Sequence, residues 1–185
     1  MPFVALLDAN VLYPIWLCDA LLRMAETEVF QVRWSERILD EALRNIKANK
    51  PGGAAAVDQR FKDMRGAFED AMVTGYETLE PVMMNASEDR HVLAAAIVGR
   101  ADVIVTKNLD DFPAGALEPY GIDAQHPDEF LCNQWELDEE AMAGVMQHWL
   151  ADLGESLTLQ QLLSRLERDV PRFCQLVRAA GLDGS

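Results

Sequence analysis

Hydrophobic residues follow two kinds of pattern along this chain. Phe3–Leu7 and Val103–Val105 are short, continuously apolar runs, which are typical of strands buried on both faces of a parallel sheet. Elsewhere, apolar residues recur at helical spacing, most clearly over Val11–Glu26, Ser35–Asn49 and Ala54–Val73. Short buried strands that alternate with helices predict an α/β fold built on an open sheet.

Weaker signals predict further elements between and after these segments. Gly75 and Pro81 bracket a short strand expected near Tyr76–Leu79, and another short strand is expected within Leu117–Asp123. The helix predicted over Ser87–Arg100 is preceded by a pattern like a capping box, Asn85 with Glu88 three residues later. Lys50–Gly53, which contains a proline and two glycines, is expected to stop the helix that starts at Ser35.

The C-terminal part of the chain shows only helical patterns. From about Leu137, the predicted helices are Glu139–Leu153, Leu159–Leu166 and Pro171–Ala180. A chain of 185 residues has room for one domain with an appendage. We therefore expect an α/β domain over residues 1–135 and a helical extension over residues 136–185.

Acidic residues stand at four places, each at or near the end of a predicted strand or on an adjoining helix. Asp8 ends the first apolar run, Glu41 lies within a helix, Asp89 begins another helix, and Asp110-Asp111 follow the second apolar run. Such positions converge on one crevice in an open α/β sheet. Carboxylates gathered there repel one another unless a cation neutralises them, and oxygen-only sites suit Mg²⁺ or Mn²⁺. The pattern predicts metal-assisted phosphoryl chemistry.

The net charge of −15 is unusual for a protein that binds phosphates, but it is unevenly distributed. Arg33–Arg65 holds eight basic and five acidic residues, a local net charge of +3, and this segment carries Glu41. Asn108–Ser164 holds twelve acidic residues and no lysine or arginine. The cationic segment is the candidate for contact with phosphates. The acidic one serves solubility or attracts a basic partner.

Cysteine and apolar content point to the cytoplasm. Cys18, Cys132 and Cys174 are few and widely spaced, as expected of buried, reduced thiols. No apolar run reaches the roughly 18 residues of a membrane span, and Met1–Phe3 lacks the basic start of a signal peptide. The four tryptophans are expected in the core or at interfaces and not as base-stacking platforms. His91 follows Asp89 by two residues, about 200° round a helix, and no catalytic role is expected for it.

Four sequence segments together resemble the PIN-domain nucleases, and more closely the toxin ribonucleases of the VapC kind. They are LLDANVLYP at Leu6–Pro14, ILDEALRN at Ile38–Asn45, EDRHVLAAA at Glu88–Ala96 and VIVTKNLDDFP at Val103–Pro113. The resemblance continues in GIDAQHPDEFL at Gly121–Leu131. It implies a Rossmann-like α/β/α sandwich with a mostly parallel sheet.

The family's acidic tetrad falls on Asp8, Glu41 and Asp89, with a less certain fourth member. The chain reads Thr-x-Asn where many members have an aspartate, so Asn108, Asp110 and Asp111 all remain candidates, with Asp111 preferred. Asn10 and Thr106 are candidates for orienting ligands, water or substrate. The basic residues Arg37, Arg44 and Lys107 are candidates for binding RNA phosphates, although helix salt bridges would explain the arginines equally well.

The resemblance implies a metal-dependent endoribonuclease that uses Mg²⁺ or Mn²⁺ to activate water, with RNA as substrate. It also implies a cognate antitoxin as partner and a possible homodimer. The alternative is a PIN-like module that binds RNA or protein without cutting. Two other classes fit poorly, because a haloacid-dehalogenase phosphatase needs an aspartate where this chain has Asn10, and a receiver domain needs a second acid near Asp8.

Overall fold

A five-stranded, entirely parallel sheet forms the centre of the first part of the chain. The computed structural model describes residues 3–49 and 54–182. Its strand order is β3-β2-β1-β4-β5, with strands at Val4–Leu7 (β1), Gln31–Ser35 (β2), Met72–Val73 (β3), Val103–Val105 (β4) and Asp123–Gln125 (β5). The predicted α/β fold with a parallel sheet is confirmed.

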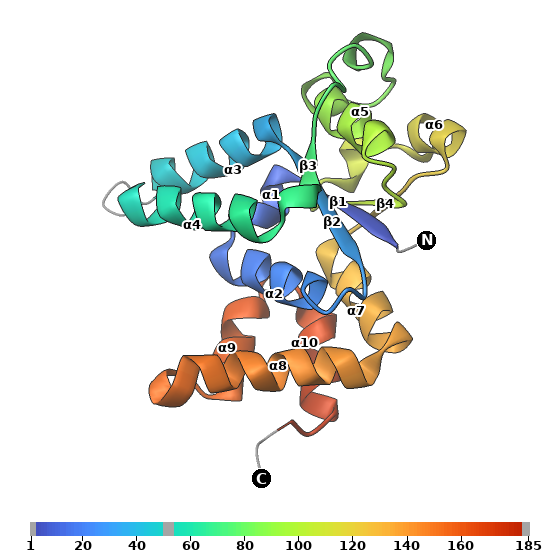
Figure 1. Ribbon diagram of the computed structural model, residues 1–185. Coiled ribbons are helices and arrows are strands. Elements are labelled where there is room, and N and C mark those ends of the chain that lie inside the picture. The colour runs from blue at the N-terminus through green and yellow to red at the C-terminus, as the bar shows by residue number, and fades with distance from the viewer. Residues whose placement is uncertain (1–2, 50–53, 183–185) are drawn as a thin grey trace. The chain divides into compact units, whose positions relative to one another are not determined.

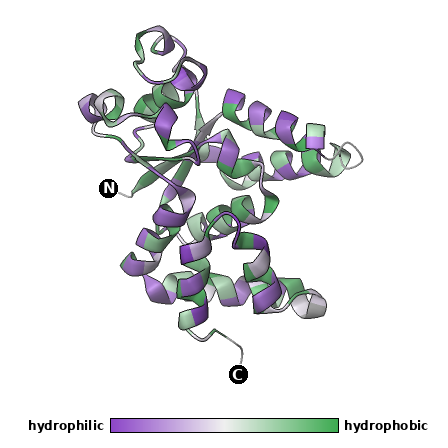
Figure 2. Cartoon of the chain, turned by 180° about the vertical axis from the view of Figure 1, so that it is seen from behind, coloured by the Kyte–Doolittle hydropathy of each residue, from purple (hydrophilic) through white to green (hydrophobic). Residues whose placement is uncertain are grey.

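The central strands β1 and β4 are the two apolar runs of the sequence. Every residue of both strands is buried, and Leu7 pairs with Val105 at their carboxyl ends. Figure 2 shows these strands as hydrophobic, whereas the surrounding helices alternate between hydrophobic and hydrophilic residues. The chain leaves β1 for β2 on one side and later returns to β4 on the other. The carboxyl ends of β1 and β4 therefore form the switch point at which open α/β sheets bind ligands.

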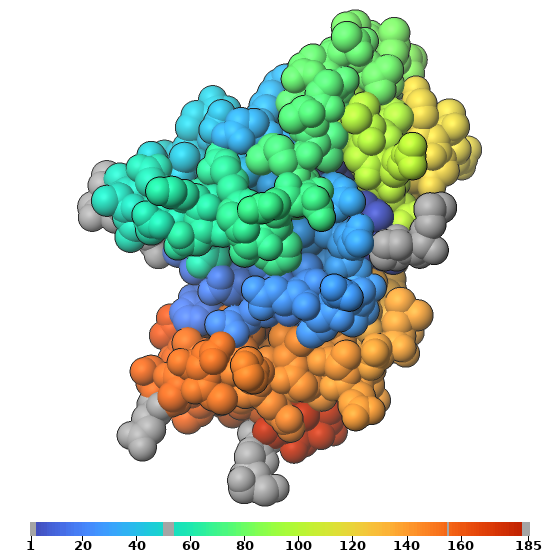
Figure 3. Space-filling model, viewed as in Figure 1, coloured from blue at the N-terminus to red at the C-terminus, as the bar shows by residue number. Residues whose placement is uncertain are grey.

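Helices cover both faces of the sheet. Figure 1 shows α3 (Glu36–Asn49) and α4 (Ala54–Ala67) on one side, and α5 (Arg90–Val98) and α6 (Ala114–Leu117) on the other. In Figure 3, α3 and α4 lie against each other in the cyan and turquoise part of the surface. Residues 92–96 of α5 are small or branched and fully buried, which lets this helix pack closely against its neighbours.

The chain divides into two compact units, and α2 (Ile15–Ala25) groups with the C-terminal helices. The first unit comprises residues 1–14 and 31–126, and the second comprises residues 15–30 and 127–185. The second unit contains α2, α7 (Pro127–Leu137), α8 (Glu139–Leu153), α9 (Leu159–Leu166) and α10 (Pro171–Ala179). The helices predicted in this region are confirmed. The boundary expected near residue 135 stays a prediction.

Aromatic contacts hold the second unit together. Trp16 stacks on Trp149 at 6.2 Å between ring centroids, and the guanidinium of Arg165 lies 4.6 Å from the Trp16 ring. Trp135 meets Phe173 edge to face at 5.9 Å. Trp34, Trp135 and Trp149 are buried, as expected. The three cysteines are buried and reduced, also as expected.

Several local predictions were wrong. The segment Val11–Glu26 is not one helix, because Pro14 separates α1 (Ala9–Leu12) from α2. The helix expected to reach Val73 ends at Ala67, and the strand expected at Tyr76–Leu79 lies earlier, at Met72–Val73. A strand of two residues pairs with Trp34 and Ser35 but is too short to show a period of two.

The capping box expected at Asn85 is absent. Its amide nitrogen and oxygen are buried and make no hydrogen bond within the described residues, and α5 begins only at Arg90. The predicted stop at residues 50–53 lies outside the described residues, although α3 does end at Asn49. None of the helices in the described ranges has the length and apolar character needed to cross a bilayer.

Candidate active site

Asp8 lies at the switch point, where its carboxylate accepts hydrogen bonds from three donors. It follows β1, is 5% exposed and caps α1 through a bond of 2.7 Å from the Ala9 amide to Oδ1. Oδ2 accepts hydrogen bonds from the Thr106 hydroxyl at 2.7 Å and from the Asn10 amide at 2.6 Å. The Asp8 backbone amide also donates to the Val105 carbonyl, and this bond ties the residue to β4.

Asn10 and Thr106 form a small network around Asp8. The Asn10 amide donates to the Thr106 hydroxyl at 2.9 Å, and its oxygen accepts from the Lys107 backbone amide at 2.9 Å. The Asn108 backbone amide donates to the Thr106 hydroxyl at 3.1 Å. Both side chains therefore orient Asp8, and they fix the loop after β4 relative to the end of β1.

Glu41 reaches the site from α3 and carries three basic contacts on Oε1. Nε2 of His91 lies 3.3 Å away, Nε of Arg37 3.4 Å and Nη2 of Arg44 4.0 Å. Burial alone would raise the pKa of Glu41, but the bonds and charges of His91 and Arg37 outweigh it and hold the pKa below its usual value. Glu41 is therefore an ionised carboxylate at neutral pH.

Asp89 and Asp111 meet in the same region. Asp89 ends a 3₁₀ turn, Ser87–Asp89, and stands directly before α5, whereas Asp111 ends the 3₁₀ turn Leu109–Asp111 after β4. The amide of Ala86 donates to the carbonyl of Asp111 and joins the two turns. Burial, the charges of Asp8 and Asp111, and a hydrogen bond with the Asp111 side chain raise the pKa of Asp89 to about 6.

These interactions bring Asp8, Glu41, Asp89 and Asp111 together as an acid cluster. The charge of Glu41 contributes to raising the pKa of Asp8, after the larger effect of burial. Three residues after β4 are candidates for the fourth ligand. Asp111 is half-buried and bonded to Asp89, whereas Asn108 and Asp110 are exposed. The geometry favours Asp111 as the fourth acid.

The donor chemistry of the acid cluster fits a hard divalent cation. Carboxylate oxygens predominate, and the charges of Asp8 and Asp111 contribute to raising the pKa of Asp89, a repulsion that a bound cation would relieve. Within residues 3–49 and 54–182, no three acidic, histidine or cysteine side chains stand close enough to coordinate one ion as they lie. Binding would thus require the Asp89–Asp111 bond, or the ion pairs of Glu41 with Arg37 and Arg44, to rearrange.

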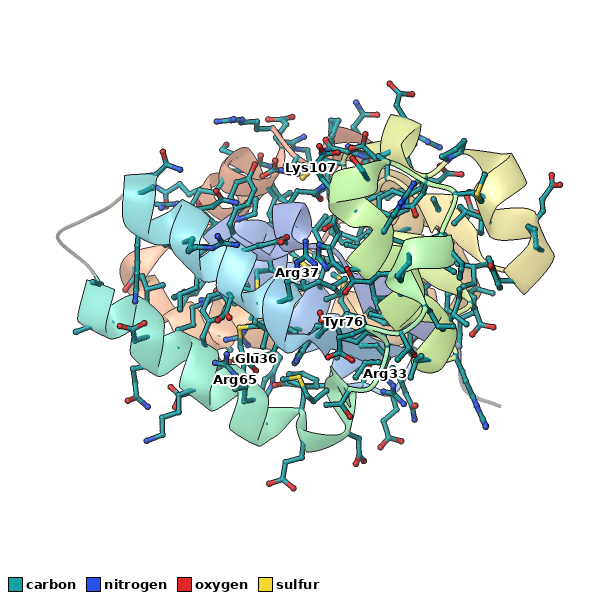
Figure 4. The ribbon with its side chains drawn as sticks, turned by 90° about the horizontal axis from the view of Figure 1, so that it is seen from above. Arg33, Glu36, Arg37, Arg65, Tyr76 and Lys107 are labelled. Atoms are coloured by element: carbon teal, nitrogen blue, oxygen red, sulfur yellow. The ribbon has the colours of Figure 1, made fainter. Side chains whose placement is uncertain are left out.

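Basic residues line α3 beside the acid cluster. An open groove of ≈ 630 Å³ is bordered by Glu36, Arg37, Asp40, Leu43, Arg44 and Lys47. Arg37 also contacts Glu80 at 3.1 Å, and Arg44 is 74% exposed. Figure 4 shows Arg37 between the ribbons of α3 and α5, with Lys107 near the top of the view. Nζ of Lys107 lies 5.8 Å from the centre of the Tyr13 ring.

The contact between His91 and Glu41 is a feature of the site that the sequence reasoning missed. The 200° argument assumed that one regular helix begins at Ser87, but Asp89 has φ −105° and ψ 9°, so it stands outside α5. His91 is 1% exposed, contacts Glu41, and its charge also lowers the pKa values of Asp8 and Asp89. Its place in the segment EDRH, two residues after an expected ligand, was the available signal.

A model of the PIN domain matches residues 4–110. The chain belongs to the PIN-domain family. The match covers Asp8, Glu41 and Asp89, and it ends one residue before Asp111. A second model, the VapC50 C-terminal domain, matches residues 127–179, which lie in the second unit. This PIN-domain protein thus carries the helical extension of a VapC-like subgroup, as the sequence resemblance implied.

A curated relative supports the same placement within the PIN-domain family. The chain is 45% identical over 116 residues to the protein named "Putative ribonuclease VapC50" of Mycobacterium tuberculosis (strain ATCC 25618 / H37Rv). The alignment covers 62% of this chain and 69% of the relative. No solved structure matches the chain at a comparable level of significance.

Proposed function

We propose that this PIN-domain protein is a metal-dependent endoribonuclease and the toxin of a toxin–antitoxin pair. The observation that carries the proposal is the acid cluster at the switch point, in which Asp89 has a pKa of about 6 because of burial and two neighbouring acids. Carboxylates held this close at a sheet edge suit a cation. The VapC50-like relative is named as a ribonuclease, and we extend that activity to this chain.

In this proposal Asp8, Glu41, Asp89 and Asp111 hold Mg²⁺ or Mn²⁺, with Asn108 as the remaining candidate ligand. The bound ion supplies a water of lowered pKa and offsets charge on the phosphate. Asn10 and Thr106 orient Asp8 through bonds of 2.6 and 2.7 Å, and the bond from Thr106 partly offsets the burial that raises the pKa of Asp8. Because water would be the nucleophile, the proposed reaction requires no nucleophilic side chain next to the carboxylates.

Arg37, Arg44 and Lys107 are proposed to bind RNA phosphates next to the acid cluster. In the structure Arg37 and Arg44 contact Glu41, so a cation that engages Glu41 weakens these ion pairs and leaves the guanidinium groups available. Metal and RNA would then bind cooperatively on the α3 side. This arrangement also explains how a chain with a net charge of −15 binds a polyanion locally.

The partner proposals follow from the same charges. An antitoxin segment that carries an arginine would pair with the acid cluster, because guanidinium and carboxylate form strong bidentate bonds. The acidic stretch 108–164 would add longer-range attraction for a basic partner. We further propose that the protein forms a homodimer and is located in the cytoplasm. We also propose that the chain divides into a nuclease domain of residues 1–135 and an extension of residues 136–185.

The test is cleavage of defined single-stranded RNAs by the wild type and by Asp8→Asn, with Mg²⁺, with Mn²⁺ and with EDTA. The carboxamide keeps the size of the side chain but removes its charge. We expect cleavage by the wild type with metal, and none by the variant or in EDTA. RNA binding without cleavage under every metal would overturn the proposal in favour of a non-catalytic binding module.

A further inference from the structure

A buried histidine makes the contact that links the two helices bearing Glu41 and Asp89. His91 lies in the first turn of α5 and is 1% exposed, and its Nε2 lies 3.3 Å from Oε1 of Glu41 on α3. The residues that follow it, 92–96, are fully buried, so the imidazole has little freedom to move. We propose that His91 is a positioning residue that holds Glu41 at a fixed distance from Asp89.

The other two contacts of Glu41 cannot hold it at a fixed distance from Asp89. Arg37 and Arg44 lie on α3 together with Glu41, and their side chains are 46% and 74% exposed. Exposed ion pairs within one helix are weak and easily rearranged. Of the three contacts, His91 alone reaches Glu41 from a different element and from a buried position.

His91 also stands within electrostatic reach of two further acids. Its charge acts on Asp8, at the end of β1, and on Asp89, two residues earlier in the chain. The histidine therefore lies among three of the four acids of the acid cluster, which come from three different segments. A residue in that place sets the spacing of the carboxylates before any ion arrives, in the manner of groups that orient metal ligands.

An ordinary core histidine would have both nitrogens satisfied by neighbouring groups. Both ring nitrogens of His91 are buried without a hydrogen-bond partner among the described residues, and the contact of Nε2 with the Glu41 carboxylate, at 3.3 Å, is an ion-pair contact. A buried nitrogen without a partner is unfavourable for folding. Stability alone therefore gives no reason to have histidine here, whereas orientation of Glu41 does.

The inference rests on the proposed metal site, and its test measures metal binding directly. The probe is Mn²⁺ without RNA, with free Mn²⁺ followed by electron paramagnetic resonance and heat by calorimetry. The variants are His91→Gln and His91→Asn. A glutamine amide nitrogen occupies about the place of Nε2, and an asparagine amide nitrogen about that of Nδ1, so the pair separates the Glu41 contact from polarity and burial.

We expect His91→Asn to weaken Mn²⁺ binding about 10- to 100-fold, the usual effect of losing a group that orients a ligand. His91→Gln should stay close to the wild type. Combining His91→Asn with Glu41→Gln should give no further loss beyond Glu41→Gln, because the histidine acts through that carboxylate. Circular dichroism and thermal unfolding confirm that each variant is folded.

Equal Mn²⁺ affinity in the wild type and in folded His91→Asn would overturn the inference, as would equal losses in the Asn and Gln variants. Failure to bind Mn²⁺ at all in the wild type would overturn it together with the proposed metal site. Absence of RNA cleavage with intact Mn²⁺ binding contradicts only the proposed activity. In that case the comparison of the two variants still decides the role of His91.

Discussion

The Thr106 hydroxyl donates a hydrogen bond of 2.7 Å to Oδ2 of Asp8, a residue 98 positions earlier in the chain. The two residues directly follow β4 and β1, and the pairing of Leu7 with Val105 sets their separation. The parallel pairing of β1 with β4 thus brings Thr106 to the place where it can hold Asp8. The orientation of Asp8 at the end of β1 therefore depends on the side chain of Thr106 at the end of β4.

Replacing Thr106 by valine should weaken the site without displacing the strands. The change keeps the shape but removes the donor to a buried carboxylate, so we expect a loss of metal-dependent cleavage of about 10- to 100-fold. The free energy of unfolding should fall by about 1–3 kcal/mol. Thr106→Ser retains the hydroxyl and serves as the control in urea unfolding and cleavage assays. Full activity of the valine variant would contradict this role of the hydroxyl.

Asp111 and Asp110 should respond differently to conversion into asparagine. Asp111 is bonded to Asp89 and half-buried, whereas Asp110 is exposed. Asp111→Asn is expected to lower cleavage about tenfold or more, which corresponds to about 1.4 kcal/mol in the barrier. Asp110→Asn should remain near the wild type. The reverse order would assign the fourth acid to Asp110.

The metal-free protein should lose stability as the pH rises through the range from about 4 to about 6. The pKa of Asp89 is raised from 3.8 to about 6 by burial and by the charges of Asp8 and Asp111. The folded state therefore holds a proton that the unfolded state has released, and this advantage disappears once the pH exceeds the folded pKa. Urea unfolding in EDTA at several pH values measures the effect.

Asp89→Asn is the control for this pH dependence. The variant lacks the titrating group and relieves the repulsion on Asp8, so its stability should vary less with pH over the same range. A metal ion should also reduce the dependence in the wild type, because it takes the place of the proton. Identical pH profiles for the wild type and Asp89→Asn in EDTA would exclude Asp89 as the source.

Arg44→Gln should weaken RNA binding to a similar extent for all sequences. Arg44 is 74% exposed beside Glu41 and borders the groove on α3. If Arg44 contacts one phosphate, the plot of the log of the RNA-binding constant against log salt concentration should be less steep in the variant, by about 0.7 for single-stranded RNA. Arg168→Gln removes an equal charge from an exposed position in the second unit and should leave the slope unchanged. Equal effects of both variants would indicate only a general charge effect.

Asp128→Ala should destabilise the second unit. The buried Asp128 carboxylate accepts hydrogen bonds from the backbone amides of Arg172 and Phe173, at 3.2 and 2.9 Å, and so caps α10. Loss of such a cap lowers the free energy of unfolding by about 0.5–2 kcal/mol. Asp138→Ala, at the exposed cap of α8, is the comparison and should cost less. Mn²⁺ binding by the folded Asp128 variant should be unchanged.

The local pattern of the sequence was sufficient to predict the elements that are long or continuously buried. β1 and β4 are apolar throughout because both faces of a central parallel strand are covered. The helices of the C-terminal part follow from the spacing of their apolar residues. β2 and β3 were missed or misplaced, since their few residues carry no clear periodicity and are recognised only through their pairing partners.

Three of the acids were found from the sequence because they stand near element ends where a parallel sheet gathers side chains, and the family motifs marked these positions and that of Glu41 within its helix. Only the tertiary structure decided how they are held. It joined Thr106 to Asp8, favoured Asp111 over Asp110, and turned His91 towards Glu41 because α5 starts after Asp89. These relationships depend on backbone angles and on strand pairing across long separations, and a one-dimensional pattern of residue types contains neither.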